Sequence, residues 1–326
     1  MSEGIPKITK SVEQQLADLR EIQRALAEAR EAGDAATAEA LMEQHRDAVE
    51  DAMDDVEASG LSPAESERLL GKDFLGSKKI ENVFGRKLER HIPFSKEELQ
   101  RAKELDQQLI LQNDVMDVKN PDTGKMERNV PVTLENLKKY FPKAHDDTSI
   151  WYSQDWYDNE DFFKKEKPRT GWRLTSKDLI PSSTSKSYLE QADILIDHIQ
   201  NQVFKGAKLP KQYEDAIAEF KHKRAEIEPL AKSSKDGEWK RGSQMLADLK
   251  ITKLTRELPV EVMYRLILND QENKDKLLPS TYTWTAGRGS VGRLVAVGGL
   301  DDRGAGVNGD GPGTRLGTLG ASFSRS

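Results

Sequence analysis

Residues 282–326 have the sequence YTWTAGRGSVGRLVAVGGLDDRGAGVNGDGPGTRLGTLGASFSRS, and this stretch decides the fold that the sequence predicts. It holds about half of the 23 glycines of the chain. Apolar, aromatic and arginine residues recur between the glycines, at Tyr282, Trp284, Arg288, Leu294, Val295, Val297, Val307, Pro312, Leu319, Phe323 and Arg325. The LVAV run and the alternation of Leu319, Ala321 and Phe323 predict short strands. A regular frame filled in with small or polar residues is typical of a display surface and not of an active site.

The composition sets the class of protein. A chain of 326 residues is long enough for two or three domains, and with 33% charged residues it predicts a soluble protein. The net charge of −6 argues against a nucleic-acid partner. The absence of cysteine excludes disulfides, thiolate nucleophiles and Cys-ligated zinc, and it favours a cytoplasmic location. The N-terminal MSEGIPKITK is not a signal peptide, and no window is apolar enough for a membrane helix.

The N-terminal part predicts a disordered lead-in over residues 1–10 and an acidic helical hairpin over 11–60. Residues 11–60 hold 14 acidic and 4 basic side chains, so their net charge is −10. Gly33-Asp34 predicts the end of one helix and the N-cap of the next. The second helix carries a heptad seam at Ala38, Met42, His45, Val49, Ala52 and Val56. An alanine-rich seam is weak alone, so we expect it to pack on a partner copy or on the rest of the protein.

Residues 61–147 predict a mainly helical connecting domain. Ser62-Pro63-Ala64-Glu65 has the capping box and first-turn proline of a helix start. A second capping box at Ser95 precedes a run that we expect to be helical as far as Leu111. Residues 120–124, NPDTG, predict a hairpin turn between short strands, and Thr133 is expected to open another helix.

Residues 148–326 predict a second domain, which holds all five tryptophans of the chain. Apolar spacing predicts helices over 184–204, 210–232, 239–256 and 260–268. We expect Trp172 and Trp284 to be core residues, because a large aromatic side chain buries a large area.

No motif of this chain indicates catalysis or metal binding. His45, His91, His145, His198 and His222 do not cluster, and there is no HExxH, GxSxG or GKS/GKT sequence. Asp155, Asp158, Glu160 and Asp161 lack the glycine-containing loop of a calcium site, so we expect a solvated acidic loop. The sequence therefore predicts a protein that is not an enzyme and that has no catalytic residue, metal or cofactor.

Three segments together carry a resemblance to a known family. The GWRLTS element at Gly171–Ser176, Trp284-Thr285, and the terminal LGASFSRS resemble the bacterial C-type-lectin-like domains of the paralogous-domain and formylglycine-generating-enzyme type. The resemblance implies an α+β fold: an N-terminal helical region, then a C-type-lectin-like domain over 148–326 with a helical insertion at about 205–256 and short C-terminal strands. It implies a structural frame of Gly171, Trp172, Trp284, Arg288 and Phe323. Thr175 replaces the family's usual proline, and the lack of cysteine excludes formylglycine-generating chemistry.

The same tail is similar to the variable proteins of diversity-generating retroelements, which use this fold. In these proteins a reverse transcriptase mutates adenines in codons near the 3′ end, and the encoded residues form a ligand-binding face. The resemblance implies variable ligand-binding slots at Arg293, Ala296, Gly299, Arg303, Ala305, Asn308, Gly309, Asp310, Gly311, Thr314, Arg315 and Thr318. It implies a non-enzymatic protein that displays a variable C-terminal recognition surface to a protein or other macromolecular ligand. Because many slots hold small residues, we expect weak affinity for most ligands.

Two other functions stay open from the sequence alone. The chain is alternatively a structural or assembly protein whose N-terminal helices join copies or bind a partner. An enzyme with an unrecognised site has only scattered carboxylates in its favour.

Overall fold

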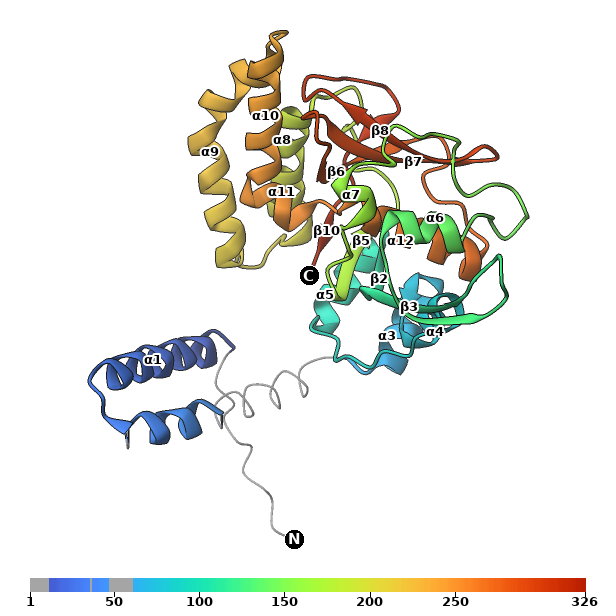
Figure 1. Ribbon diagram of the computed structural model, residues 1–326. Coiled ribbons are helices and arrows are strands. Elements are labelled where there is room, and N and C mark those ends of the chain that lie inside the picture. Colours follow the sequence, from blue (N-terminus) through green and yellow to red (C-terminus); the bar gives the residue numbers. More distant parts are fainter. Residues whose placement is uncertain (1–11, 36, 47–60) are drawn as a thin grey trace. The chain divides into compact units, whose positions relative to one another are not determined.

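The computed structural model describes residues 12–35, 37–46 and 61–326, and its secondary structure is a mixture of 46% helix and 18% strand. The predicted α+β class is therefore confirmed. Contacts divide the chain into two compact units (Figure 1). One unit, called here the hairpin unit, comprises Met1–Ser62 with His91–Lys96; the other, the main unit, comprises Pro63–Arg90 with Glu97–Ser326. In the described parts of both units, no helix has the length and apolar character needed to cross a membrane.

The hairpin unit begins with helix α1 (Val12–Glu31), and residues 37–46 form a second helix. Gly33 ends the first helix with φ of +70°, and the Asp34 carboxylate accepts a hydrogen bond from Thr37 N at 3.1 Å. The predicted helix stop and N-cap at Gly33-Asp34 are therefore confirmed.

Side-chain contacts show that these two helices run antiparallel. Gln23 Nε2 lies 3.1 Å from His45 Nε2, and Arg30 donates to Met42 Sδ at 3.5 Å. The predicted hairpin is thus present as far as residue 46. The disordered lead-in expected at residues 1–10 and the seam positions Val49, Ala52 and Val56 lie outside the described residues.

The main unit contains ten α-helices, three short helical segments and three sheets within its described residues. The helices are α3 (Pro63–Leu70), α4 (Ser77–Phe84), α5 (Lys96–Glu104), α6 (Leu134–Tyr140), α7 (Asp161–Lys164), α8 (Tyr188–His198), α9 (Lys211–Lys232), α10 (Asp236–Asp248), α11 (Lys250–Thr255) and α12 (Pro259–Leu268), with the short segments η1 (Gly71–Asp73), η2 (Ile199–Val203) and η3 (Asn269–Asn273). The strands are β1 (Phe74–Leu75), β2 (Gln107–Gln112), β3 (Val115–Lys119), β4 (Met126–Pro131), β5 (Gly171–Ser176), β6 (Tyr282–Arg288), β7 (Leu294–Asp301), β8 (Gly304–Asp310), β9 (Leu319–Gly320) and β10 (Ser324–Arg325).

The first four-stranded sheet has the order β1-β2-β5-β10 and joins distant parts of the chain. Strand β10 is antiparallel to β5, with Ser324 opposite Thr175 and Arg325 opposite Leu174. The GWRLTS segment and the last strand are therefore neighbours, although more than a hundred residues separate them in sequence.

The second four-stranded sheet has the order β8-β7-β6-β9 and is formed by the glycine-rich tail. Strands β6, β7 and β8 are antiparallel neighbours, whereas β9 pairs parallel to β6. The short strands predicted for the LVAV run and for the end of the chain are thus confirmed. A separate hairpin, β3-β4, closes over residues 120–124, where Asn120 Oδ1 accepts from Asp122 N at 2.9 Å.

The prediction for residues 61–147 was only partly right. Helices start at Pro63 and, with Thr133 as N-cap, at Leu134, as expected. The run expected to be helical as far as Leu111 instead leaves the helix after Glu104 and forms β2. Strand β2 lies between β1 and β5 in the sheet, and every one of its residues is buried, so both of its faces are covered. Burial on both faces removes the period-two pattern that identifies a strand.

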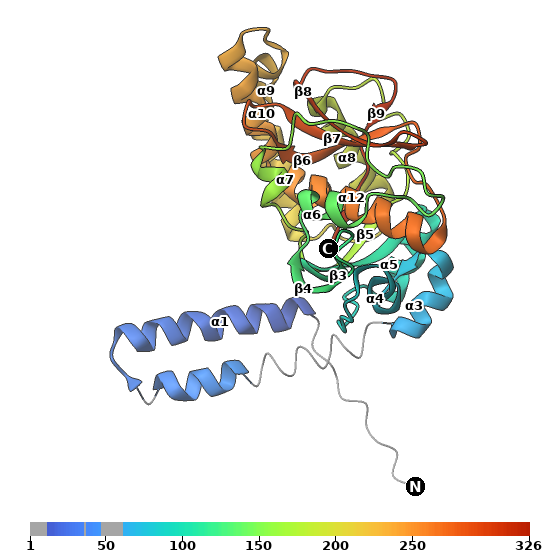
Figure 2. The ribbon, with the colours of Figure 1, turned by 45° about the vertical axis from the view of Figure 1, so that its right-hand side comes forward.

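Helix α12 is the central element of the main unit, and every one of its residues is buried. It packs against β6 and β7 on one side and against α4 and α6 on another. Helices α8 to α11 gather beside the tail sheet in both views (Figure 1, Figure 2). Their apolar side chains form one core with Trp284, Leu294 and Phe323. Helices α9, α10 and α11 occupy the range 205–256 for which the sequence predicted a helical segment.

Candidate functional site

A groove of about 850 Å³ lies between the glycine-rich tail and the helices beside it. One wall is formed by the tail, through Arg293, Asp310, Gly311, Pro312, Gly313, Thr314 and Arg315. The other wall is formed by helices α8 to α10 and their connections, through Ser187, Leu189, Glu190, Arg224, Glu228, Ala231, Lys232, Ser233, Ser234 and Trp239. The volume is within the range of about 300–1,000 Å³ that is usual for ligand pockets.

Backbone hydrogen bonds fix the tail loop at the start of α8. Tyr188 N donates to Pro312 O at 3.1 Å, and Ser185 N donates to Leu316 O at 2.9 Å. The same helix start has a capping box, in which Ser187 and Glu190 satisfy each other's backbone N–H groups. The loop that forms one wall is therefore fixed to a helix with a capped N-terminus. Because the loop is already held in place, it loses little conformational entropy when a ligand binds.

Glu190 also connects the two walls. Its two carboxylate oxygens each accept from the Arg315 guanidinium at 3.0 Å. With 50% of the Arg315 side chain and 36% of the Glu190 side chain exposed, this pair contributes little to stability. It does fix the direction of the Arg315 side chain at the rim of the groove.

The other charged side chains that line the groove make fewer hydrogen bonds than the Glu190–Arg315 pair. Lys232 pairs with Glu228 at 2.5 Å along α9, and Arg224 pairs with Asp193 at 2.6 Å. Arg293 has one hydrogen bond, to Gly309 O at 3.3 Å. These mixed charges can accept both acidic and basic groups of a ligand.

Asp310 stands out among the acidic residues of the groove. Burial raises the pKa of its carboxyl group, and the positive charge of Arg293 opposes this increase. Within the described part of the chain its carboxylate has no hydrogen-bond partner. It is therefore available to a donor group of a ligand.

The helical wall is rigid where α9 meets α10. A Cβ atom at Gly242 would lie 2.8 Å from Ala231 N, so the two helices approach closely. The turn between them is held by Ser233 Oγ, which donates to Glu238 at 2.6 Å. The half-buried Trp239 follows this turn and presents the one aromatic side chain among the residues that line the groove.

The structure brings together five of the slots implied by the resemblance: Arg293, Asp310, Gly311, Thr314 and Arg315 line the groove. Three others lie outside it. Arg303 is paired with Asp301 in the β7–β8 turn, Asn308 accepts from Gln154 Nε2 at 3.1 Å, and Thr318 is exposed beyond the loop.

The remaining four slots do not belong to an open surface, and here the sequence interpretation needs correction. Ala296 and Ala305 are each 1% exposed. A Cβ at Gly299 would lie 2.4 Å from the Tyr282 hydroxyl, and one at Gly309 would lie 2.8 Å from the Trp156 ring. These positions are small because they pack inside strands β7 and β8, and side chains there do not reach a ligand.

The frame residues lie as the sequence predicted or close to it. Trp172, Trp284 and Phe323 are buried, whereas Gly171 and Arg288 are half-buried. Trp284 meets Tyr188 edge to face with ring centroids 5.6 Å apart, and Trp172 donates to Arg90 O at 3.0 Å. The expectation that both tryptophans are core residues is confirmed.

Sequence reasoning missed the helical wall. Arg224, Glu228, Lys232 and Trp239 lie in helices whose exposed faces are charged throughout, so nothing in their spacing singles them out. Trp239, placed just after a polar turn, was the one available signal.

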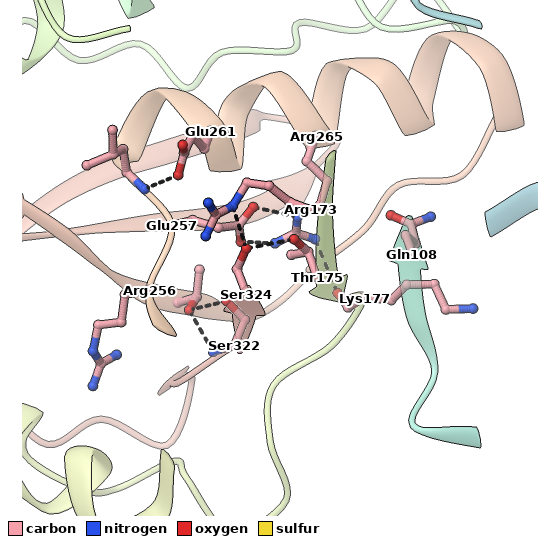
Figure 3. A network of polar contacts seen from close by, with 12 residues as sticks. Gln108, Arg173, Thr175, Lys177, Arg256, Glu257, Glu261, Arg265, Ser322 and Ser324 are labelled. Atoms are coloured by element: carbon pink, nitrogen blue, oxygen red, sulfur yellow. Dashed lines mark hydrogen bonds and ion pairs between the residues drawn. The ribbon is translucent and has the colours of Figure 1, made fainter. Parts of the chain in front are cut away.

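A buried polar network connects β5, β10 and α12 (Figure 3). Arg265 and Glu257 form a two-point ion pair with distances of 3.0 and 2.8 Å. Arg173 donates from Nε to Ser324 Oγ at 3.0 Å, and this hydroxyl lies 2.9 Å from Thr175 Oγ1. The network therefore joins the two strands that bring the distant GWRLTS segment and the tail together.

Glu261 of α12 is the most highly bonded carboxylate near this network. The Arg169 guanidinium donates to its two oxygens at 2.9 and 2.6 Å, and Leu258 N donates at 2.8 Å. Burial alone raises the pKa of Glu261, but the bonds and charge of Arg169 outweigh burial and hold the pKa below its usual range. Glu261 is thus a structural anion that lacks the free oxygen of a catalytic base.

Groups with a catalytic appearance are otherwise sparse in the described residues. His145 Nδ1 lies 2.7 Å from Asp270, whose other oxygen accepts from His145 N. No serine, threonine or water-activating group among the described residues hydrogen-bonds to this ring, so the pair acts as a loop anchor. No cluster of three metal-ligating side chains occurs in 12–35, 37–46 or 61–326. In the acidic loop, Glu160 is bonded to Ser290 N and Oγ.

Comparison with family models, with curated proteins and with solved structures finds no match to this chain.

Proposed function

We propose that this chain is a non-enzymatic binding protein whose recognition site is the groove between the tail and helices α8–α10. The observation that carries the proposal is the meeting of Arg293, Asp310, Gly311, Thr314 and Arg315 in one groove. These positions were selected from sequence alone, and they converge although they span more than twenty residues.

We further propose that the main unit is a C-type-lectin-like domain with a helical insertion. The pairing of β5 with β10 supports this assignment, because the resemblance rests on both segments. The antiparallel order of β6, β7 and β8 supports it as well. Helices α9 to α11 form the insertion in this proposal.

Recognition in this proposal comes from two walls with different roles. The tail loop supplies exchangeable side chains, and the helices supply a constant wall with Trp239 and Arg224. Tryptophan and arginine are the side chains that most often dominate binding energy. The constant wall therefore offsets the small residues of the tail, which the sequence alone had suggested would bind weakly.

The binding role is tested with two displayed libraries of the full chain. One randomises the five groove slots, and the matched control randomises Asp122, Thr123, Lys125, Met126 and Arg128, which are exposed on the β3–β4 hairpin. Both are selected against the same panel of immobilised proteins. We expect specific binders from the groove library at a yield at least tenfold above the control. Equal yields would falsify the assignment of the groove.

The retroelement role is tested at the genomic locus. We expect a near-identical template repeat and a reverse transcriptase gene beside this gene. In sibling strains, codon changes are expected at the groove slots, while Ala296, Gly299, Ala305 and Gly309 keep small residues. Substitutions spread evenly over 148–326 would contradict a variable protein and leave the binding role standing.

Assembly through the N-terminal helices is the second candidate function. Between Asp18 and Arg46, Ala29 is the one buried side chain of the described residues, and Met42 is 52% exposed. Short helices depend on packing for stability, so such a hairpin favours a second copy as partner. Light scattering on a chain that starts at Leu61 tests this: fewer copies per particle than the full chain supports assembly, and an unchanged number of copies argues against it.

A further inference from the structure

A second pocket of about 300 Å³ lies where β5 begins and α11 ends. It is lined by Arg169, Gly171, Trp172, Arg173, Lys253 and Ser326, among others. None of its lining residues belongs to the groove, so the two sites are separate. Arg169, Arg173 and Lys253 are the three cationic side chains among its lining residues, which include no Asp or Glu.

Arg173 is the central residue of this pocket. Its side chain is almost fully enclosed, with the residue 3% exposed, yet its guanidinium makes one hydrogen bond, from Nε to Ser324 Oγ. The four N–H groups on its two terminal nitrogens have no acceptor within the described part of the chain. Figure 3 shows the guanidinium extending beyond Ser324. The terminal nitrogens keep contact with the space of the pocket, so these N–H groups can donate to an acceptor from outside the chain.

Two of the neighbouring carboxylates are already bonded by other cations. Glu261 is bonded by both nitrogens of the Arg169 fork, and Glu257 is bonded by Arg265 in the same two-point manner. Each of these anions is therefore neutralised by its own partner. The charge of Arg173 has no dedicated counter-ion.

Lys253 adds to the positive charge of the pocket. Its side chain is 60% exposed and lies 3.6 Å from Asp248, which is 54% exposed, so its ammonium group is able to turn toward the pocket. Burial lowers the pKa of Arg173, and the nearby Arg169 adds to the decrease although Glu261 and Glu257 oppose it. An unpaired cation in this environment is stabilised by an anion.

We propose that this pocket binds a phosphate group, either free or carried by a small ester. An arginine fork presents two parallel donors that match two phosphate oxygens. Lys253 then approaches a third oxygen, which a planar carboxylate does not possess. Arg169 contributes at most one remaining N–H, because its other donors bond Glu261, Lys253 O and Arg256 O. The pocket volume suits a compact anion and excludes a large ligand.

The test is a calorimetric titration of the full chain with inorganic phosphate at constant ionic strength in chloride. We expect saturable binding to the unmodified chain. Arg173→Met should weaken it by about tenfold to a hundredfold, the effect of losing charged hydrogen bonds. Lys253→Met should weaken it about threefold, because its charge is largely solvated. Lys221→Met, an exposed α9 residue away from the pocket, should bind as the unmodified chain does.

Two further arms make the outcome decisive. Titration with glycerol 2-phosphate separates the sources: binding of both compounds indicates that an ester fits, and binding of inorganic phosphate alone indicates the free ion. If Arg173→Met fails to fold by circular dichroism, the comparison of Lys253→Met with Lys221→Met still tests the site. Absence of saturable phosphate binding to the unmodified chain overturns the proposal, and so does binding that Lys253→Met and Lys221→Met weaken equally.

Discussion

Strands β7 and β8 and the loop over residues 311–318 are both rich in glycine, but the space around their glycines differs. A Cβ at Gly298 would lie 2.2 Å from Thr281 O, and one at Gly304 would lie 2.4 Å from the carbonyl carbon of Trp151. Both residues also have positive φ. At Gly311, by contrast, a Cβ would meet nothing within 4 Å. The strand glycines Gly298 and Gly304 are thus required by close packing, whereas Gly311 in the loop is not.

This difference explains how one segment can form both the packed strands and the recognition surface proposed above. Positions in β7 and β8 are filled by neighbours, so any larger side chain needs the sheet to move. The loop after β8 is attached by its backbone, through Pro312 O and Leu316 O, and the side chains of Leu316 and Thr318 are exposed. Stability and recognition are therefore carried by different atoms of the same stretch.

The largest expected effect comes from placing an arginine once in strand β7 and once in the loop. Ala296→Arg puts an unpaired charge in the core beside Trp284, and we expect a loss of about 4 kcal/mol or more in the free energy of unfolding. Thr314→Arg, on the loop, should change it by less than about 0.5 kcal/mol. Urea unfolding followed by tryptophan fluorescence measures both, since all five tryptophans lie in the main unit. Equal effects of the two variants would mean that the loop is as tightly packed as the strand.

A second experiment tests whether the buried polar network that contains Arg265 and Glu257 is packed as tightly as strands β7 and β8. Arg265→Met leaves the Glu257 carboxylate, which is 1% exposed, without its counter-ion, and should cost about 3–5 kcal/mol in the same assay. Replacing both residues by methionine should recover much of this loss. Lys211→Met breaks an exposed pair on α9 and should cost less than about 0.5 kcal/mol. A small effect of Arg265→Met would show that water reaches Glu257.

The smallest expected effect concerns pH. Burial and the charge of Glu261 raise the pKa of Glu166 to about 7, against the opposing charge of Arg169. Because the folded state holds this proton while the unfolded state has released it, stability falls as the pH rises from about 4.5 to about 7. Glu166→Gln should therefore be equal to the unmodified chain near pH 4.5 and more stable by about 2–3 kcal/mol at pH 8. Urea unfolding at several pH values measures the difference. A constant difference over this range would contradict the raised pKa.

The sequence predicted helices α9 and α12 well. Both have regular apolar spacing, and a proline marks the start of each, Pro210 for α9 and Pro259 for α12. The sequence did not predict β2, whose burial on both faces removes the alternation of a strand. The pairing of β5 with β10 could be expected only through the family resemblance, since no local pattern encodes contact between distant segments.

The sequence predicted one wall of the groove and missed the other. The tail contributes residues that its composition singled out, whereas the helical wall contributes ordinary surface charges and Trp239. Spacing along a helix shows which face is exposed, but it does not show which exposed residues stand opposite a distant loop. The packed slots, such as Ala296 and Gly309, were misassigned for a related reason: a small residue looks the same in sequence whether it is tolerated or required.

The position of β10 in the chain has a consequence for synthesis. Strand β10 follows the loop in sequence, and β5 has no partner on that edge until β10 arrives. A ribosome must therefore translate the whole loop in the correct reading frame before the sheet can be completed. A frameshift within the loop codons removes β10 and leaves the backbone N–H and C=O groups at that edge of β5 unpaired. In the variable protein proposed above, a frameshifted copy would therefore lack the completed sheet, whereas a copy that differs only in loop side chains would keep it.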